Sequence, residues 1–497
     1  MDYAASLDPG ELRKMAAAKL DFQAARARFY QSHYDLEAGI IALLDTAERR
    51  TFQTFLAESH ANWCELVVNA VAERLKVVGF RFGSKDDSDA AWAIWQANSL
   101  DADASLVLKD ALVQGSAFML VQPDDDNPSG VCISGESAMQ ATVLYEPGSR
   151  RKRIAGYKRF PVDPWVNMEM SEFAEGSLLT ATGSQVEVLI LPDEIYTWLP
   201  GSSQPSVEPN PAGFVGLIEI VPQPRTLGPG RSELHSAVSI QDRIHTTIFN
   251  RLVATDYGAF RQIWATGIKI ARQVIKDDDT ATGGTVTSRV VARPFDVGAN
   301  RLLANEAPDG KFGSFPESTL AGYLSSVTQD VQQLAAITQT PPHYLLGQMV
   351  NLAADAIKAA ETGLVSKCGE RSRYAGESFE EVMRCAFTLT GSAAAADTSA
   401  EVVWADMETR SEGQRVDALV KMATLGVPRE ILWQKWGATP QEIDEWNELL
   451  AASASETVEI QPALPRGVKA APADTAPPQP DALAVNPSAP PAPAPAQ

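Results

Sequence analysis

The fold is decided by the segment STLAGYLSSVTQDVQQLAAI (318–337), the break TQTPPHYLLGQMVN (338–351) and the long alanine-rich run that follows up to Phe387. In the first piece, apolar residues recur every three or four positions, which places them on one face of a helix. They are Leu320, Leu324, Val327, Val331 and Leu334. Pro341 and Pro342 end this helix, because proline has no backbone N–H and strains the residue before it out of helical geometry.

The run after the break keeps the 3.6-residue period for about nine turns. Its apolar face holds Ala353, Ile357, Ala360, Leu364, Cys368, Ala375, Phe379, Val382 and Ala386. Asn351 is a suitable N-cap for this run, because its side chain accepts a hydrogen bond from a free N–H of the first turn. The sequence therefore predicts two helices joined by a short, kinked, non-helical loop. On periodicity alone, the pair is typical of two core helices with a proline-marked turn.

A more specific interpretation comes from a resemblance to a known family. The segment ITQTPPHYLLG (337–347) and the run NLAADAIKAAETGLVSKCGERSRYAGESFEEVMRCAF (351–387) resemble the portal proteins of long-tailed double-stranded DNA bacteriophages, the subunits of the head-to-tail connector ring. In that family the first helix belongs to the stem, the break is the tunnel loop that touches DNA in the channel, and the long helix runs through the wing to the crown.

A second segment, from Pro222 to Gly267, carries the same resemblance. The residues that match the family pattern are Gly230, Ser232, Glu233, Leu234, Gln241, Asp242, Asn250 and Arg251. His245 replaces the asparagine that is usual in the family at that position. A Gly/Pro turn precedes Ser232, which is therefore expected to cap the helix that follows.

The resemblance covers roughly residues 25 to 450 and implies an α+β fold: the phage portal fold with an α/β wing, a helical stem, a small α/β clip, a long wing helix and a helical crown. The expected segments are the N-terminal α/β wing (1–231), first stem helix (232–262), clip (263–317), second stem helix (318–338), tunnel loop (339–351), long wing helix (352–390), crown (391–455) and a disordered Pro/Ala-rich tail (456–497). The tail composition cannot bury a core.

Local patterns in the wing predict individual elements. An amphipathic helix starts near Asn62 and runs into a short strand that ends near Phe82, Asp101 is expected to cap a later helix, and Gly115 to end it. Runs that alternate or are rich in β-branched residues predict strands between turn-rich segments. The expected strands are Ala117–Gln122, Ala141–Tyr145, Arg153–Phe160, Gln185–Ile190, Glu194–Leu199 and Val215–Val221.

Composition sets the broad class. At 497 residues, with 45% hydrophobic and 21% charged residues, most of the chain should form several globular domains. No window approaches eighteen consecutive apolar residues, so no transmembrane helix is expected, and the N-terminus shows no signal-peptide pattern. The four cysteines are widely spaced without a CxxC pair, which fits a reducing compartment better than a disulfide framework.

The formal net charge is −21. A protein that grips DNA through its phosphates needs a basic footprint, so this balance argues against a sequence reader or a tight clamp. It is compatible with a conduit through which DNA slides, and equally with an acidic surface that only keeps the protein soluble. The densest basic cluster, GSRRKR (148–153), is expected to be a solvated hairpin turn.

No motif for catalysis is present. The five histidines are scattered, and HExxH, GxSxG, GxGxxG after a strand and Cys/His metal clusters are all missing. The consecutive Asp277, Asp278 and Asp279 lack the alternating spacing of a calcium loop. We therefore expect no catalytic residue, no metal and no cofactor. The alternatives left open are a hydrolase or transferase with a site in the αβ region 100–220, and another minor structural protein of a virion.

The resemblance implies a function as a non-enzymatic channel subunit. It implies a dodecameric ring at one capsid vertex, through which double-stranded DNA is packaged and ejected without sequence specificity. It further implies contacts with the major capsid protein, a scaffolding protein, the terminase large subunit and a head-to-tail adaptor, assembly in the host cytoplasm, and no membrane. The loop residues implied to line the DNA channel are Gln339, Thr340, Pro341, Pro342, His343, Tyr344, Gln348, Met349 and Asn351.

Overall fold

The structure is a computed structural model of the 497-residue chain. The residues that it describes are 7–36, 58–161, 185–259, 263–266, 272–276, 288–292, 311–314, 319–347, 354–408 and 412–456. Contacts divide the chain into two units, Met1–Ile443 and Asp444–Gln497. In the second unit, the described residues are those of the C-terminal part of one helix, α12 (Pro440–Glu456).

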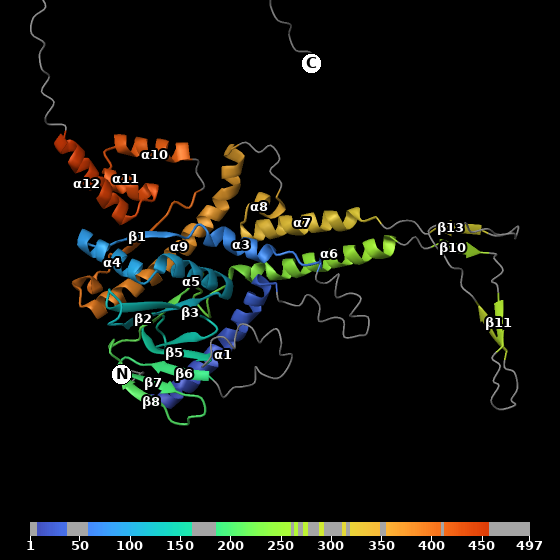
Figure 1. Ribbon diagram of the computed structural model, residues 1–497, viewed down its shortest axis with the longest axis horizontal. Helices are drawn as coiled ribbons and strands as arrows, with labels where there is room; N and C mark the ends of the chain where they lie inside the picture. Colours follow the sequence, from blue (N-terminus) through green and yellow to red (C-terminus); the bar gives the residue numbers. More distant parts are fainter. Residues whose placement is uncertain are drawn as a thin grey trace, which may run out of the picture. The chain divides into compact units, whose positions relative to one another are not determined.

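The N-terminal helix α1 (Pro9–Tyr34) covers a five-stranded antiparallel sheet (Figure 1). The strands are β4 (Ala141–Tyr145), β5 (Arg153–Pro161), β6 (Gln185–Ile190), β7 (Glu194–Trp198) and β8 (Ser206–Pro209), paired in that order. The helix begins where Asp8 accepts a hydrogen bond from the Gly10 N–H and Pro9 takes the first helical position. Its buried Leu12, Ala16 and Leu20 form a core with Tyr157 of the sheet, whereas Tyr30 near its C-terminus packs in the core that includes α5.

A smaller antiparallel sheet lies at the centre of the fold. Its strands are β2 (Ala117–Pro123), β3 (Val131–Ser137) and β9 (Leu217–Ile220), with β2 in the middle. The first five residues of β2, AFMLV, are all buried, because one face of the strand packs with α5 (Leu100–Gln114) and α9 (Ala354–Thr390), while Phe118 and Leu120 on the other face pack in a core with β4. A strand covered in this way needs a continuous apolar run rather than an alternating one.

The long helix α9 brings distant parts of the chain together. Its Phe379 packs edge-on against Trp95 of α4 (Lys85–Ala97), with ring centroids 5.6 Å apart, and lies near Trp404 of β14 (Glu401–Trp404). Strand β14 in turn pairs with β1 (Val77–Arg81), which follows α3 (Trp63–Ala72). One core cluster therefore includes α3, α4, α5, β2 and α9.

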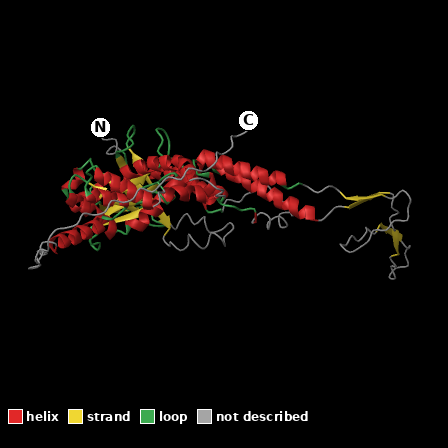
Figure 2. Ribbon diagram, turned by 90° about the horizontal axis from the view of Figure 1, so that it is seen from above, coloured by secondary structure: helices red, strands yellow, loops and turns green. Residues whose placement is uncertain are grey.

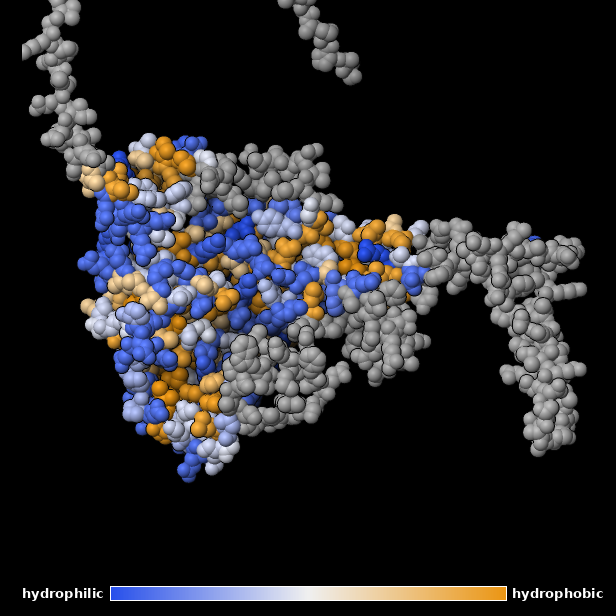
Figure 3. All heavy atoms as spheres, in the orientation of Figure 1, coloured by the Kyte–Doolittle hydropathy of each residue, from blue (hydrophilic) through white to orange (hydrophobic). Residues whose placement is uncertain are grey.

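Helices α6 (Val238–Ala259) and α7 (Ala321–Thr338) run side by side in both ribbon views (Figures 1 and 2). Arg243 of α6 forms an ion pair with Asp330 of α7 at 2.8 Å and donates a hydrogen bond to Gln333 at 2.8 Å. Figure 3 shows apolar surface over this helix pair, and Leu324 and Ile337 of α7 are more than half exposed. The pair thus has apolar surface that the described residues leave exposed.

Between these two helices, the structure describes two short antiparallel strand pairs. Strands β10 (Ile263–Thr266) and β13 (Lys311–Ser314) pair, as do β11 (Arg272–Lys276) and β12 (Ser288–Ala292). After α9 come β14 and the contacting helices α10 (Glu412–Thr424) and α11 (Arg429–Trp436). Gly437 ends α11 in the left-handed conformation, and Thr439 and Glu442 cap α12 reciprocally.

The α+β class is confirmed, and so are the six expected strands, within one or two residues at each end. Strands β3 and β8 were not expected. The hairpin prediction for residues 148–153 is confirmed, because this segment joins β4 to β5. Gly115 ends α5 with a positive φ of 93°, as predicted. The expectation that Asp101 caps this helix is wrong: Ser99 is the N-cap residue, while Asp101 accepts hydrogen bonds from Trp95 and Gln96.

Several expectations fall on parts of the chain outside the described residues, namely Asp277–Asp279, the N-cap Asn351 and the tail beyond residue 456. Among the described helices, none combines the length and apolar character needed to cross a bilayer.

We predict that Gly230→Ala destabilises the protomer by about 2–3 kcal/mol, because the added methyl group overpacks a filled site. A Cβ at this position would lie 2.1 Å from the carbonyl oxygen of Gly115. The matched control is Gly369→Ala in the middle of α9, where a Cβ meets nothing within 4 Å and should stabilise by about 0.5–1 kcal/mol. Urea unfolding of both variants checks that their free energies of unfolding change in opposite directions. A Gly230→Ala variant that is more stable than the unmodified chain would contradict the close approach of Gly230 to the Gly115 carbonyl.

Candidate functional site

The candidate site is the turn that follows α7. Helix α7 ends at Gln339, which adopts the left-handed conformation with φ 54°, and the N–H of Thr340 bonds back to the carbonyl of Ala335 at 3.0 Å. Pro341 and Pro342 then start a five-residue helix, α8 (Pro342–Leu346). The prediction of a non-helical loop is therefore wrong for residues 342–346. Proline cannot continue a helix, but its fixed φ suits the first turn of a new one.

The described residues of this turn divide by exposure. Gln339 and Pro342 are exposed, whereas Thr340, Pro341 and His343 are buried and Tyr344 is half-buried. Three further residues of the expected tunnel loop, Gln348, Met349 and Asn351, lie outside the described residues. The described part of the turn is thus a folded base from which only two of its expected channel residues reach solvent.

Tyr344 fixes α8 to α9 and to the turn that follows α3. Its hydroxyl accepts a hydrogen bond from Arg74 at 2.8 Å and donates one to Glu361 of α9 at 2.8 Å. The guanidinium of Arg74 also lies over the Tyr344 ring, 5.6 Å from its centroid. Burial, followed by the hydrogen bond to Glu361, raises the pKa of Tyr344. Trp63 adds a bond from its indole N–H to the carbonyl of Leu345 at 3.3 Å.

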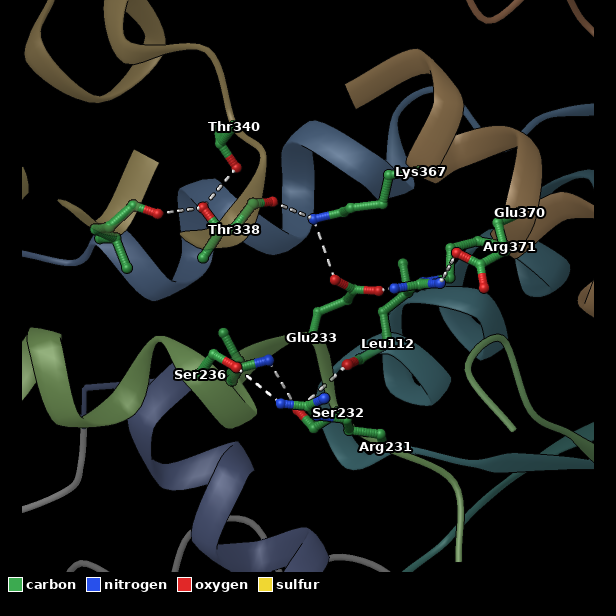
Figure 4. Close-up of polar contacts among 12 residues, drawn as sticks. Leu112, Arg231, Ser232, Glu233, Ser236, Thr338, Thr340, Lys367, Glu370 and Arg371 are labelled. Carbon is green, nitrogen blue, oxygen red and sulfur yellow. Dashed lines mark hydrogen bonds and ion pairs between the residues drawn. The ribbon is translucent and has the colours of Figure 1, made fainter. Parts of the chain in front are cut away.

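The end of α7 is held from α9. Lys367 donates a hydrogen bond to the carbonyl oxygen of Thr338 at 2.8 Å, and the Thr338 hydroxyl donates to the carbonyl of Leu334 at 2.7 Å (Figure 4). The carbonyl end of a helix carries partial negative charge, so a lysine ammonium there is favourable. Thr340 lies 3.0 Å from Thr338, hydroxyl to hydroxyl, which ties the first loop residue to the same cluster.

Lys367 belongs to a buried ionic network. Its ammonium lies 3.1 Å from Glu233, and Arg371, one turn further along α9, pairs with the other oxygen of the same carboxylate (Figure 4). The three side chains are only 4–6% exposed. Arg371 also contacts the exposed Glu370 at 3.0 Å, so two carboxylates balance two cations.

The network sets the charge state of Glu233. Burial alone would raise its pKa, but the charges of Lys367 and Arg371 and their hydrogen bonds outweigh burial and lower it. A carboxylate whose pKa is lowered by folding contributes stability above its unfolded-state pKa, and this contribution is lost as pH falls through the folded-state pKa.

Glu233 is itself positioned by its neighbours. It opens the short 3₁₀ turn η3 (Glu233–Ser236), where Ser232 accepts a hydrogen bond from the N–H of Leu234 at 3.0 Å. The Ser232 hydroxyl donates to the carbonyl of Val113 at the end of α5, at 2.5 Å. The expectation that Ser232 caps the helix carrying Val238 is thus wrong: Ser232 caps η3, and α6 starts later, at Val238.

Two polar cavities flank the network. One, of about 280 Å³, is lined among others by Arg231, Glu233, Gln339 and Lys367. The other, of about 410 Å³, lies beside Gln339 and Arg373. Neither is lined by residues of the 100–220 region in which an enzymatic site was the alternative. Within the part of the chain that the structure describes, no three His, Cys, Asp or Glu side chains are grouped as metal ligands.

Three of the scattered histidines meet near the start of α6. His245 contacts the carbonyl of Ala61 at 2.9 Å through Nε2, and its ring lies 5.7 Å from that of His60. His33 lies 3.5 Å from Asp242, and hydrogen bonding to this carboxylate raises the pKa of His33, while burial lowers that of His245. His245 bonds to backbone, which an asparagine amide can also do.

Sequence reasoning did not find the Glu233–Lys367–Arg371 network. The available signal was that Lys367 and Arg371 lie four residues apart among Leu364, Cys368 and Ala375 on the apolar face of the long helix. Charged residues in such a face are expected to be paired when they are buried.

Comparisons with known proteins define the class of this protein. Residues 45–456 match the family model described as phage portal protein, SPP1 Gp6-like. The chain therefore belongs to the SPP1 Gp6-like family of phage portal proteins. It is 28% identical over 492 residues to the portal protein of Mycobacterium phage L5, with 95% of each chain covered. It is 29% identical over 470 residues to the portal protein of Mycobacterium phage D29, with 90% of each covered.

Two solved structures show a weaker similarity. One is the virion of a native gene transfer agent particle, with 12% identity and a TM-score of 0.37, covering 79% of this chain and 90% of the other. The other is the neck of an empty gene transfer agent particle computed with C6 symmetry, with 12% identity and a TM-score of 0.38, covering 79% of this chain and 93% of the other.

We predict that Glu233→Gln destabilises the protomer by about 3–5 kcal/mol at pH 7, because it leaves two buried cations without their shared carboxylate. The difference from the unmodified chain should shrink below about pH 4.3, the unfolded-state value, as Glu233 itself becomes protonated. Glu370→Gln is the matched control: this carboxylate is 56% exposed, so a change of less than about 1 kcal/mol is expected. Urea unfolding against pH measures both, and equal effects would contradict the network's role.

We further predict that Tyr344→Phe costs about 1–3 kcal/mol, because Arg74 and Glu361 lose the hydroxyl that bridges them. Tyr374→Phe, at a 42% exposed position of α9, should change stability by less than about 0.5 kcal/mol. Thermal unfolding of the two variants at one protein concentration is the measurement. An unchanged thermal stability of Tyr344→Phe would show that α8 does not depend on this bridge.

Proposed function

We propose that this chain forms a dodecameric ring at one vertex of a phage capsid, through which double-stranded DNA enters during packaging and leaves on ejection. The observation that supports the proposal is the portal-family match over residues 45–456, which includes α6, α7, the turn and α9. Rotational symmetry turns one helix pair per subunit into the wall of a channel.

The α6–α7 pair supplies the wall in this proposal. Helix α7 has 18 residues and is therefore about 27 Å long at 1.5 Å per residue. The half-exposed Leu324 and Ile337 fit contacts with a neighbouring subunit, because apolar surface left open on a protomer favours burial on assembly. We assign the strands β10 to β13, between the two helices, to the clip that meets the packaging motor.

The tunnel loop supplies the contact with DNA. We assign this contact to the exposed Gln339 and Pro342 and to Gln348, Met349 and Asn351. Thr340, Pro341, His343 and Tyr344 complete the loop as its folded base. None of the nine side chains is an aspartate, glutamate, lysine or arginine. Such groups touch a duplex through van der Waals contacts and hydrogen bonds, without sequence specificity and without gripping phosphates.

The remaining roles belong to the same proposal. The ring would contact the major capsid protein, a scaffolding protein, the terminase large subunit and the head-to-tail adaptor. It would assemble in the host cytoplasm and reside at the portal vertex of the virion. The chain would carry no catalytic activity of its own, with ATP hydrolysis supplied by the terminase.

The direct test is a cryo-electron-microscopy reconstruction of virions that carry the tagged chain. The proposal expects twelve tagged copies in one ring around a central hole, with the turn at Pro341 directed toward the axis. A tag distributed over the capsid surface, or a compact monomer outside any ring, would refute it.

We predict that replacing Gln348, Met349 and Asn351 together by glutamate leaves ring assembly intact but lowers DNA retention about tenfold, because carboxylates repel phosphates in the bore. The same three positions replaced by alanine are the control, with retention within about threefold of the unmodified chain. Packaged DNA is measured by nuclease protection, and rings by negative-stain imaging. Normal retention in the glutamate variant would place DNA away from this segment.

A further inference from the structure

The outer face of α1 carries an apolar stripe that the described part of the chain leaves exposed. Met15, Phe22 and Phe29 follow one another at seven-residue intervals and are 46%, 67% and 49% exposed. Between them lie the exposed Ala18 and Ala25. We call these five residues the α1 seam.

The spacing of the seam is that of a helix–helix contact. Its members alternate at intervals of three and four residues, the arrangement in which the large side chains of one helix insert between those of another. The small Ala18 and Ala25 leave room for a partner backbone to approach. The seam runs over 15 residues, about 21 Å of helix, which matches two heptads of a partner.

The helix behind the seam is fixed. The opposite face of α1 is buried on the five-stranded sheet through Leu12, Ala16 and Leu20. Gln23 also donates hydrogen bonds to the carbonyls of Ala138 and Ala141, at 2.8 and 2.9 Å. A partner would therefore dock on a preorganised surface, which lowers the entropic cost of binding.

The charges beside the seam are mostly positive. Helix α1 has five basic residues against two acidic ones, a net +3 in a chain of net −21. Asp21 is paired with Arg159 at 2.5 Å, and Arg13 with Glu187 at 2.7 Å. Four cations then remain along the two flanks of the seam: two are exposed, and the charged groups of the other two contact backbone carbonyls, one of them also an aromatic ring. These cations are Lys14, Lys19, Arg26 and Arg28.

We propose that the α1 seam docks an acidic amphipathic α-helix of a partner protein. The partner's apolar residues would insert between Met15, Phe22 and Phe29, and its flanking carboxylates would face the cations along α1. Complementary charges beside an apolar seam set the choice and orientation of the partner helix. This inference is independent of the role of the tunnel loop.

Two other occupants fit the observations less well. A second copy of α1 would set like charges against each other along both flanks. A membrane surface suits a broad apolar face, whereas the seam subtends an arc of only about 80° at 100° per residue, with the buried face of the same helix already used.

The test uses the full-length chain and a synthetic, fluorescein-labelled peptide of three heptads. In each heptad, leucine occupies the two positions that would face the α1 seam, and glutamate occupies the positions on either side of them. A peptide with lysine at the flanks is the control. Fluorescence anisotropy should show the glutamate peptide binding at least about tenfold more tightly than the lysine peptide. Phe22→Glu should weaken binding about tenfold or more. Leu106→Glu, at a 60% exposed position outside the seam, should leave it within about twofold.

Three outcomes would overturn the proposal. The first is equal binding of the two peptides, or an equal loss of peptide affinity in Phe22→Glu and Leu106→Glu. Either result would mean that the charges and apolar residues of the seam do not determine peptide binding. The second is a chain that binds phosphatidylglycerol vesicles through Phe22 but not the glutamate peptide. The third is binding to the isolated protomer that disappears in purified rings, which would identify the seam as an interface between subunits.

Discussion

The shared carboxylate of Glu233 is the interaction on which the central arrangement depends. It lies where η3 leads into α6, and its two partners, Lys367 and Arg371, come from α9 more than 130 residues later. Lys367 simultaneously holds the last carbonyl of α7. Burying three charges costs desolvation energy, and this cost is offset only when all three meet in one geometry. The network therefore defines how η3, α7 and α9 meet, more than it adds to net stability.

Much of the fold could be predicted from sequence, because many of its helices and strands have a clear local sequence pattern. Periodicity places α7 and α9, and alternation with turn residues places β4 and β6 with their observed ends. Strand β8 gives no such signal, because all four of its residues are exposed at the sheet edge and nothing selects an apolar face. Asp101 was misplaced as a cap because a carboxylate at a helix start can equally accept from side chains, here Trp95 and Gln96.

The position of the candidate site could be predicted from sequence, but its local structure and contacts could not. The double proline marks the break, yet two opposite effects of proline compete there: it ends α7 and it preorganises α8. Nor does sequence spacing reveal that Tyr344 turns inward, because its partners, Arg74 after α3 and Glu361 of α9, lie on distant segments of the chain. The pairing of Lys367 and Arg371 with Glu233 is missed for the same reason. Contacts between distant segments depend on packing that no local window contains.

Passage of a polymer through the proposed channel requires two properties of the tunnel loop. The part that packs on the rest of the protein must be firmly anchored, and the part that contacts the polymer must bind it only weakly. Symmetry multiplies each contact by the number of subunits in the proposed ring. A contact of about 1 kcal/mol per subunit already sums to roughly 10 kcal/mol when all subunits engage at once, and charge-assisted contacts at two or three times that strength would arrest the duplex. In the proposed ring, side chains that bind the duplex only weakly would keep that sum small, while Tyr344 and the Glu233 network would hold the base of the loop in one place as DNA moves past. Rigidity and weak adhesion are thus complementary demands on such a channel, and in this proposal different residues meet them.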